Sequence, residues 1–390
     1  MDRVSTVLRS LAHLARALVL VPVLLAAGMP QADDGGAWRD RLAAALDRAE
    51  AEGHSGLGVY VLDLASGESV SHRGAERWYL ASMVKVPVAI AVLRAIERGQ
   101  FTLDTTLLLR ADDYVDGGGT INQRAPDTPL SIAALMEQMI IHSDNTASDM
   151  LIGLVGLDAV NAVVAELAPE GSIGPVTRLS DVRHLVYGRL VPDALRLGGT
   201  DLVALNRVRD DGARLALLAR LTGTPVAHMR LPSLQAAYDG FYASGLNSGR
   251  LDGYAQILVA LHEGRAVGPR HTAYLLGLMR RVATGTQRIQ PGLPADVRWE
   301  HKTGTQRGRF CDAGLVRAGR ADAPRYVAVV ACTRGDLSLA RSELALRRVG
   351  AALCRSGLIT NGVPDAPSCP SLPAAAAAAA AAPAARPVRR

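Results

Sequence analysis

The order of hydrophobic and polar positions predicts strands near both ends of the chain and helices between them. Residues 37–53 have helical periodicity, and residues 57–74, "LGVYVLDLASGESVSHRG", alternate as two strands around a Ser-Gly turn. From Ala81 the pattern is helical until about Thr284, with loop-like interruptions at 112–129 and 198–211. Three strands follow at 297–306, 310–319 and 325–335, and a final helix runs from Leu337 to about Arg355.

Strands at both ends of a helical stretch indicate one sheet built from the two distant segments. We therefore expect an α/β fold with a discontinuous sheet domain, formed by residues 37–80 and 285–357. The helical domain 81–284 would be inserted into it and would contain an extended loop region at 184–246. With 390 residues and 49% apolar content, the chain can bury one large core or two smaller ones.

The first 32 residues have the character of an export signal. Arg3, Arg9 and Arg16 precede an apolar run from Ala17 to Ala27, which is short for a membrane span and ends in small residues. The alternative is an uncleaved anchor helix, whereas a lipid anchor is not expected because no cysteine follows the run. We expect an exported protein, periplasmic or extracellular, without stable membrane insertion after cleavage.

Residues 363–390 read as an Ala/Pro-rich disordered tail, with nine consecutive alanines bracketed by prolines. The whole chain has a formal net charge of +6, but the two terminal segments carry most of it and leave the body at about +1. The basic balance therefore does not indicate a nucleic-acid partner.

The four cysteines can be placed by strand geometry. A hairpin centred between Ala321 and Asp322 would put Cys311 opposite Cys332, and opposed residues have Cβ atoms at about disulfide distance. We predict that bond, and Cys354 with Cys369 as the remaining pair. The alternative is four free buried thiols; no C-x-x-C spacing typical of a metal site is present.

Candidate chemistry comes from the use of basic residues, because the chain has 41 arginines and two lysines, Lys85 and Lys302. A guanidinium stays charged at biological pH, whereas burial or a nearby cation can make an ammonium neutral. Ser82 lies three residues before Lys85, on the same face of a predicted helix. The pair is a candidate nucleophile and base, although this spacing alone is also common on protein surfaces.

Two further motifs strengthen this interpretation. Ser143-Asp144-Asn145 opens a helical run, and Lys302-Thr303-Gly304-Thr305 lies on a predicted strand. With Ser82-x-x-Lys85, the chain resembles the penicillin-recognising serine hydrolases, specifically the class A β-lactamases, in motif order and approximate separation. The resemblance covers most of residues 40–357 and implies a β-lactamase/transpeptidase-like fold: an antiparallel sheet flanked by N- and C-terminal helices, with an inserted all-helical domain.

The resemblance also implies roles. Ser82 would be the nucleophile, Lys85 its base, kept neutral by burial and by Lys302, and Ser143 would pass a proton to the leaving nitrogen. Backbone N–H groups of Ser82 and Thr305 would form the oxyanion hole.

The resemblance also implies substrate contacts. Asn145 would hold the substrate amide. A substrate carboxylate would be bound on the strand by Thr303, Gly304 and Thr305 and by Arg307 or Arg309, although solvated arginines are an equally good reading.

The important departure lies downstream. Class A enzymes carry a Glu-x-x-Leu-Asn stretch whose glutamate activates the deacylating water, and this chain has no such stretch. Arg183 falls at the expected glutamate position, where a guanidinium cannot act as a base. Asp181 is the nearest acid, but a solvated loop residue is the simpler reading. The segment 184–246 is longer than the family usually has, and would be a lid, a rebuilt loop or a surface insertion.

Three functions are compatible with these features: a β-lactam hydrolase, a penicillin-binding D-Ala-D-Ala peptidase, and a slow covalent β-lactam- or peptidoglycan-binding protein that uses its tail for attachment. The partner would be a small β-lactam or a peptidoglycan peptide, bound by a monomer without metal or cofactor. The first is the prediction.

Other residues receive weaker readings. Glu300, by strand parity, could share the face of Lys302, while His301 could not. Tyr114 could stack on substrate from a mobile "DGGGT" loop at the cleft rim.

Overall fold

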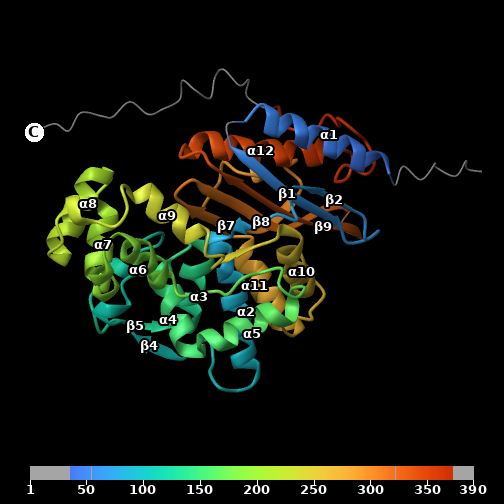
Figure 1. The fold of residues 1–390 in the computed structure, drawn as a ribbon. Coiled ribbons are helices and arrows are strands. Elements are labelled where there is room, and N and C mark those ends of the chain that lie inside the picture. Colours follow the sequence, from blue (N-terminus) through green and yellow to red (C-terminus); the bar gives the residue numbers. More distant parts are fainter. Residues whose placement is uncertain (1–35, 54, 321, 372–390) are drawn as a thin grey trace, which may run out of the picture. The chain divides into compact units, whose positions relative to one another are not determined.

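A five-stranded antiparallel sheet is the centre of the computed structural model, which describes residues 36–53, 55–320 and 322–371. Its strand order is β2-β1-β9-β8-β7, so the first two strands pair directly with the last three (Figure 1). The bounds are β1 (Gly56–Asp63), β2 (Ser69–His72), β7 (Arg298–Gln306), β8 (Arg309–Arg320) and β9 (Ala323–Arg334). The predicted sharing of one sheet by both ends of the chain is confirmed. The predicted export segment and most of the tail lie outside the described residues.

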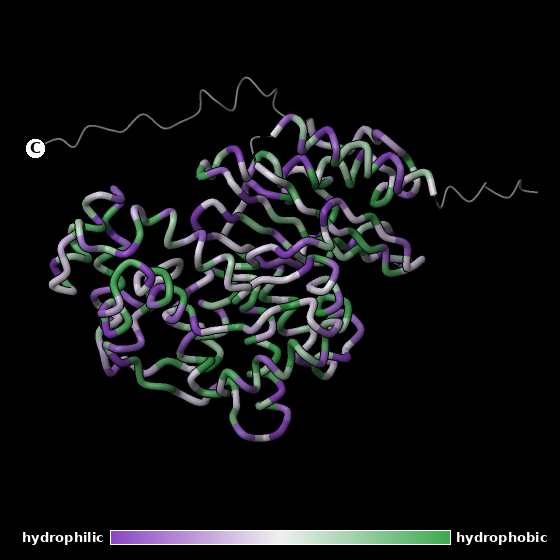
Figure 2. Tube along the Cα trace, viewed as in Figure 1, coloured by the Kyte–Doolittle hydropathy of each residue, from purple (hydrophilic) through white to green (hydrophobic). Residues whose placement is uncertain are grey.

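Helices cover both faces of the sheet, and alternate strand residues belong to different cores. Val327, Val329 and Ala331 of β9 pack in the cluster under α1 (Ala37–Ala51) and α12 (Leu339–Arg355). Their neighbours Ala328 and Val330 belong to the larger cluster on the opposite face. This period of two is what a strand buried on both sides requires. Along α1 and α12 the trace alternates between hydrophilic and hydrophobic positions, as expected of helices with one buried face (Figure 2).

The opposite face of the sheet is covered by a helical assembly around α2 (Lys85–Glu97). Ten of the 13 residues of α2 are buried, which fits a helix whose sequence is apolar on nearly every side. Around it lie α3 (Ile132–Ile141), α4 (Asn145–Val155), α5 (Leu157–Leu167), α10 (Leu251–His262) and α11 (Pro269–Met279). Two short ribbons, β3 (Trp78–Tyr79) with β6 (Ser248–Gly249) and β4 (Thr106–Leu108) with β5 (Pro129–Ser131), complete this side.

Within the described residues, no single helix is long and apolar enough to cross a membrane. Helices α4 and α5 reach the required length and composition only when taken together, and they meet at a bend of 91°.

The segment predicted as an extended loop region is mostly helical. It contains α6 (Leu179–Leu190), α7 (Gly199–Arg207), α8 (Asp211–Thr222) and α9 (Leu234–Tyr242), with short 3-10 turns between them. The loop expected at 198–211 is therefore wrong: Asp201 caps the Gly198 N–H, and Leu202 and Leu205 pack into a local core. These helices form the yellow-green group labelled α7, α8 and α9 in Figure 1. In α7, the buried leucines and the capping carboxylate of Asp201 stabilise the helix more than Gly198 and Gly199 destabilise it. The division into two domains stays a prediction.

Both predicted disulfides are present. Cys311 and Cys332 are directly opposed in the β8–β9 ladder, with their Cα atoms 4.0 Å apart. Cys354, near the end of α12, is bonded to Cys369, with a Cα–Cα distance of 5.6 Å. The alternative of four free thiols is wrong.

Removal of the Cys354–Cys369 bond should lower the free energy of unfolding by about 3 kcal/mol, because the bond closes a loop with a sequence separation of 15. Urea unfolding of Cys354→Ala, Cys369→Ala and the double variant measures this, with the midpoint falling equally in all three because either change breaks the same bond. A double variant that unfolds at the parent's urea concentration would contradict the prediction.

Candidate active site

Ser82 lies where a short 3-10 turn, Ala81–Val84, enters α2. The preceding residue, Ala81, has a φ of +49°, a left-handed conformation that costs energy for a residue with a side chain. Ser82 is partly exposed, whereas Met83, Val84 and Lys85 are buried. The turn thus presents the serine to solvent and places Lys85 one turn below it, inside the protein, as the spacing predicted.

Ser143 sits in the turn between α3 and α4, also with a positive φ, of +59°. The next residue, Asp144, caps α4 by accepting the Ala147 N–H at 2.9 Å. This turn brings three acceptors to Lys85 Nζ: the Ser143 carbonyl at 2.7 Å, Asn145 Oδ1 at 2.6 Å and Ser143 Oγ at 3.3 Å. The first two motifs therefore meet through one buried amine.

Lys302 reaches the same hydroxyl from β7. Its Nζ donates to Ser143 Oγ at 3.0 Å and to the Thr303 carbonyl at 3.1 Å. Two residues further along, a Cβ on Gly304 would lie 2.5 Å from the Leu80 carbonyl oxygen, so only glycine lets β7 approach the Ser82 turn this closely. The third motif thus lies against the first two.

Burial controls the charge of both lysines, whose side chains are fully buried. It lowers the pKa of Lys85 to about 7; the Arg183 charge acts in the same direction, while Asp144 and Asp149 oppose it. Burial also lowers the pKa of Lys302 well below its ordinary value, helped by the charge of Lys85. Desolvation is thus the main cause of the lowered Lys85 pKa, and the expected role of Lys85 as the base stays a prediction.

The glycine-rich segment predicted as a mobile rim loop is packed against the Ser143 turn. Asn145 Nδ2 donates to the Asp116 carbonyl at 2.5 Å, and Asp116 itself is buried. Gly117 has a φ of +137°, and a Cβ there would lie 2.2 Å from Asn145 Nδ2. The Asn145 amide is therefore held from both ends, by Lys85 and by this segment.

Arg183 lies beside the candidate nucleophile, as its alignment with the missing glutamate predicted. It projects from α6 and, together with Ser82, lines one small hollow, hereafter the Ser82 hollow. The hollow is lined by Tyr79, Ala81, Ser82, Asn145, Leu179, Val182, Arg183, Thr305 and Gln306. None of these described residues is acidic. Asp181, the other candidate, accepts the Arg178 N–H at the start of α6 and does not line the hollow.

The two arginines proposed for a substrate carboxylate are engaged elsewhere. Arg307 makes a two-pronged ion pair with Asp211 of α8, at 3.0 and 2.7 Å, and donates to Gln235 of α9. Arg309 lies over the Tyr242 ring, 4.4 Å from its centroid. Both side chains connect the β7–β8 turn to the helical segment 179–246.

Arg288, which no sequence motif indicated, reaches the third motif instead. It is 2% exposed and donates to Thr305 Oγ1 at 2.6 Å, to the Gly304 carbonyl at 2.9 Å and to the Cys311 carbonyl at 2.7 Å. It stands 14 residues before Lys302, in the irregular stretch before β7, where no periodicity signals burial. Its charge lies directly behind the residues expected to bind a carboxylate.

The weaker candidates are His301, Glu300 and Tyr114, and their positions follow from strand parity and local hydrogen bonds. His301 binds Asp312 at 2.7 Å and stacks on Trp299, on the face that carries α1 and α12. Glu300 is half-buried, and burial raises its pKa. The Tyr114 hydroxyl donates to the Arg124 carbonyl at 2.6 Å, and Tyr114 does not line the Ser82 hollow.

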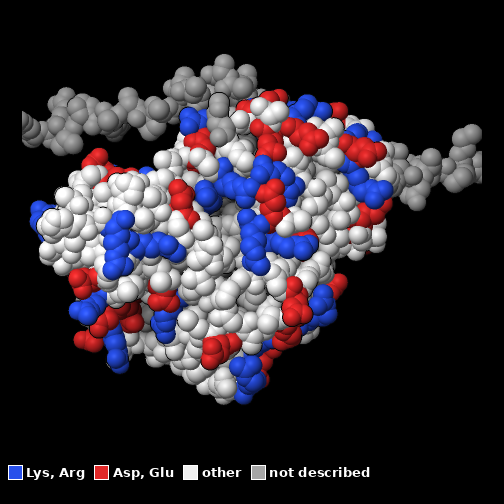
Figure 3. All heavy atoms as spheres, in the orientation of Figure 1, with Lys and Arg blue, Asp and Glu red and all other residues white. Residues whose placement is uncertain are grey.

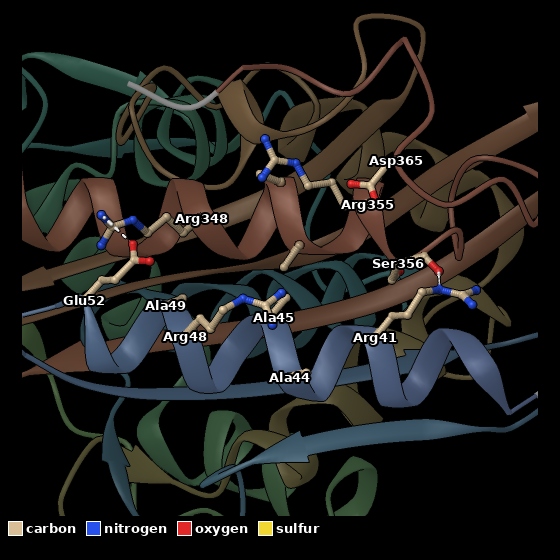
Figure 4. Close-up of a pocket in the computed structure, with 12 residues that line it drawn as sticks. Arg41, Ala44, Ala45, Arg48, Ala49, Glu52, Arg348, Arg355, Ser356 and Asp365 are labelled. Carbon is tan, nitrogen blue, oxygen red and sulfur yellow. Dashed lines mark hydrogen bonds and ion pairs between the residues drawn. The ribbon is translucent and has the colours of Figure 1, made fainter. Parts of the chain in front are cut away.

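A second concavity lies between α1 and α12 (Figure 4). This groove, of about 410 Å³, has alanines along its floor and the guanidinium groups of Arg41, Arg48, Arg348 and Arg355 around it. Arg348 pairs with Glu52, and Arg41 donates to the Ser356 carbonyl. The residues that line the groove include none from the three motifs.

On the face of the molecule shown in Figure 3, acidic and basic side chains are intermixed.

Comparisons with known proteins agree with this geometry. The model of a family described as the beta-lactamase enzyme family matches residues 39–356. Beta-lactamase OXY-2 of Klebsiella oxytoca is 26% identical over 297 residues, which cover 76% of this chain and 80% of that protein. Beta-lactamase L2 of Stenotrophomonas maltophilia is 36% identical over 100 residues, but the chain spans only 33% of that relative.

Solved structures give the same result. A beta-lactamase from Sphaerobacter thermophilus has a TM-score of 0.59 and 28% identity, covering 82% of this chain and 97% of that one. The structure of PBP-A also has a TM-score of 0.59, over 80% of this chain and 94% of that one; at 20% identity it shows the fold alone.

Substitution of Arg183 by Met should lower the free energy of unfolding by about 3 kcal/mol, because it leaves the Asp116 carboxylate buried without its ion partner, 2.6 Å away. Adding Asp116→Asn should recover most of that loss. Arg196→Met is the matched control, since its ion pair with Asp193 is exposed and contributes less than about 1 kcal/mol. Equal urea midpoints for Arg183→Met and Arg196→Met would contradict the prediction.

Proposed function

The chain belongs to the beta-lactamase enzyme family, and from that premise we propose that it hydrolyses β-lactam amide bonds through a covalent acyl-enzyme on Ser82. The observation that carries the proposal is the meeting of two buried amines at one hydroxyl, Ser143 Oγ. A partly exposed serine lies one helical turn from the first amine. This arrangement supplies a nucleophile, a base and a proton path in one place.

In acylation, Ser82 Oγ attacks the lactam carbonyl carbon while its proton passes to the neutral amine of Lys85. The lactam C–N bond then breaks, and its nitrogen takes a proton through Ser143 Oγ, which both lysines contact. Ser143 is resupplied with a proton from Lys85. The positive φ of Ser143 supports this role, since the strained turn is what directs both its carbonyl and its hydroxyl to Lys85.

The developing oxyanion would be held by the backbone N–H groups of Ser82 and Thr305, and each of these donors would lower the activation barrier by about 3 kcal/mol. Gly304 supports the second donor, because it allows β7 to lie close to the Ser82 turn.

The carboxylate of the substrate would bind at Thr303 and Thr305, in the field of Lys302 and Arg288. Arg288 supports this placement by its bond to Thr305 Oγ1. Arg307 can join only if its ion pair with Asp211 opens.

Deacylation is the step for which the site lacks the family's usual group. Among the described residues, no acid lines the Ser82 hollow, and Arg183, which the resemblance places at the position of the family's glutamate, does line it. Lys85, with a pKa of about 7, is the remaining base for the attacking water. We therefore propose turnover limited by deacylation.

The lack of an acid among the described residues that line the Ser82 hollow also favours the second candidate, a penicillin-binding D-Ala-D-Ala peptidase or slow covalent binder. For such a protein a persistent β-lactam adduct is the expected result.

We also propose that the protein acts in the periplasm or outside the cell. Two disulfides in the folded chain support this location, because such bonds persist in oxidising compartments.

The test is a chromogenic cephalosporin, followed by colour and by intact mass, with Ser82→Ala. Many turnovers per protein molecule are expected, all lost in Ser82→Ala and retained in Ser69→Ala, an exposed serine on β2. A single burst with a stable adduct on Ser82 would favour the peptidase or binder. Absence of any adduct would contradict serine acylation.

The acylation rate should rise with pH around a midpoint near 7. Lys85 acts as the neutral amine, so raising the pH through its folded-state pKa of about 7 increases the active form, and the rate at pH 5 should be about 100-fold below the plateau. Stopped-flow acylation between pH 5 and 9 measures the midpoint. A rate independent of pH across this range would exclude Lys85 as the titrating base.

A further inference from the structure

The orientation of the Asn145 amide decides whether the Lys85 amine can act as a base. A neutral amine has two N–H groups and one lone pair. Lys85 Nζ lies 2.7 Å from the Ser143 carbonyl oxygen and 2.6 Å from Asn145 Oδ1, and these two acceptors take its N–H groups and leave the lone pair for an incoming proton. If the amide were rotated by half a turn, its NH₂ group would face Nζ and donate to that lone pair. The amine would then be blocked.

The Asp116 carbonyl fixes this orientation. It accepts from Asn145 Nδ2 at 2.5 Å, and because a carbonyl oxygen can only accept, Oδ1 of the same amide must face Lys85. Gly117, in the same segment, packs against Nδ2. The position of Asp116 therefore controls the direction of the Lys85 lone pair through two hydrogen bonds.

Arg183 holds Asp116 in this position from α6. Arg183 Nε donates to Asp116 Oδ1 at 2.6 Å, and among the described residues this is the one hydrogen bond of that carboxylate. The ends of the segment are bonded to α4 and its cap, because the Val115 N–H donates to Thr146 Oγ1 and the Ile121 N–H to Asp144 Oδ2, both at 2.9 Å. Arg183 adds a tie near the residue whose carbonyl orients Asn145.

This ion pair has a cost that apolar packing would avoid. Arg183 is 9% exposed and Asp116 is 2% exposed. Among the described residues, Arg183 Nη1 and Asp116 Oδ2 are buried and have no hydrogen-bond partner. Apolar residues of similar volume often give a protein equal or greater stability than a buried ion pair does. The geometry that the pair imposes explains its presence better than stability does.

We propose that Arg183 is a positioning residue for acylation, a proposal that rests on the function proposed above. It holds Asp116, whose carbonyl orients the Asn145 amide, and that orientation leaves the Lys85 lone pair free to take the proton of Ser82 Oγ. The arginine that the resemblance places at the position of the family's glutamate thus serves acylation, in place of activating water.

Two double variants that differ only in the donor at position 183 test this. In Arg183→Gln/Asp116→Asn, the glutamine Nε2 occupies the same place along the side chain as the arginine Nε and can donate to the asparagine Oδ1. In Arg183→Met/Asp116→Asn, a methyl group occupies that place and the donor is lost.

The rate constant for acylation of Ser82 by a cephalosporin is measured by intact mass at pH 9, where Lys85 is neutral. It should stay within about 3-fold of the parent value in Arg183→Gln/Asp116→Asn and fall about 10-fold or more in Arg183→Met/Asp116→Asn. The exposed Arg196→Gln is the control and should acylate at the parent rate. Equal rate constants in the two double variants, fast or slow, would overturn the proposal, because the donor would then make no difference.

Urea unfolding of both double variants separates positioning from stability, since the assay compares only folded proteins. If Arg183→Met/Asp116→Asn does not fold, Arg183→Met/Asp116→Leu replaces it, because its two apolar side chains can pack together, and the same loss of acylation is expected. An Arg183→Met/Asp116→Leu protein that is folded and acylates at the parent rate would overturn the proposal. If the parent protein shows no label on Ser82, the proposed function fails instead, which distinguishes the two failures.

Discussion

Two buried amines that share one hydroxyl are the constraint on which the site depends. Lys85 and Lys302 both donate to Ser143 Oγ, and both side chains are fully buried. Two ammonium charges so close together in a desolvated place would repel each other and lose their hydration. The pair is therefore most stable with at least one amine neutral, which is the state that a base for Ser82 requires. Lysine, unlike arginine, can supply that state.

The fold provides this arrangement by exact placement of backbone. Lys85 begins a helix that is apolar on nearly every side, and its side chain is fully buried. The positive φ at Ala81 directs Ser82 outward, and the positive φ at Ser143 directs the turn between α3 and α4 inward, toward Lys85. Such backbone strain is typical of functional sites. Gly304 permits β7 to close the site from the third side. The Ser82 turn with α2, the Ser143 turn and β7 each supply one part of the site, and the site forms only where these three elements meet.

The sequence predicted those parts that depend on local periodicity and on motif spacing. The shared sheet and the opposed cysteines follow from alternation and hairpin symmetry, whereas the expected position of Arg183 near Ser82 follows from the resemblance to class A β-lactamases. Residues 184–246 were expected to form an extended loop region inside a helical stretch, and α7 was missed because glycines interrupt its short apolar repeat and its stability comes from packing with its neighbours. Arg288 was missed because its burial is a tertiary property of an irregular segment. The ion pair of Arg307 with Asp211 joins positions nearly a hundred residues apart, which spacing cannot reveal.

The rarity of lysine makes the central claim directly measurable. With lysine as the labelled amino acid, NMR of the side-chain Cε and Nζ nuclei gives two signals for the whole chain, assigned with Lys85→Arg and Lys302→Arg. The structure predicts that Lys85 titrates near pH 7 and that Lys302 titrates well below its ordinary value. Two signals that both titrate near the unperturbed value of about 10.4 would contradict the neutral-amine account of this site.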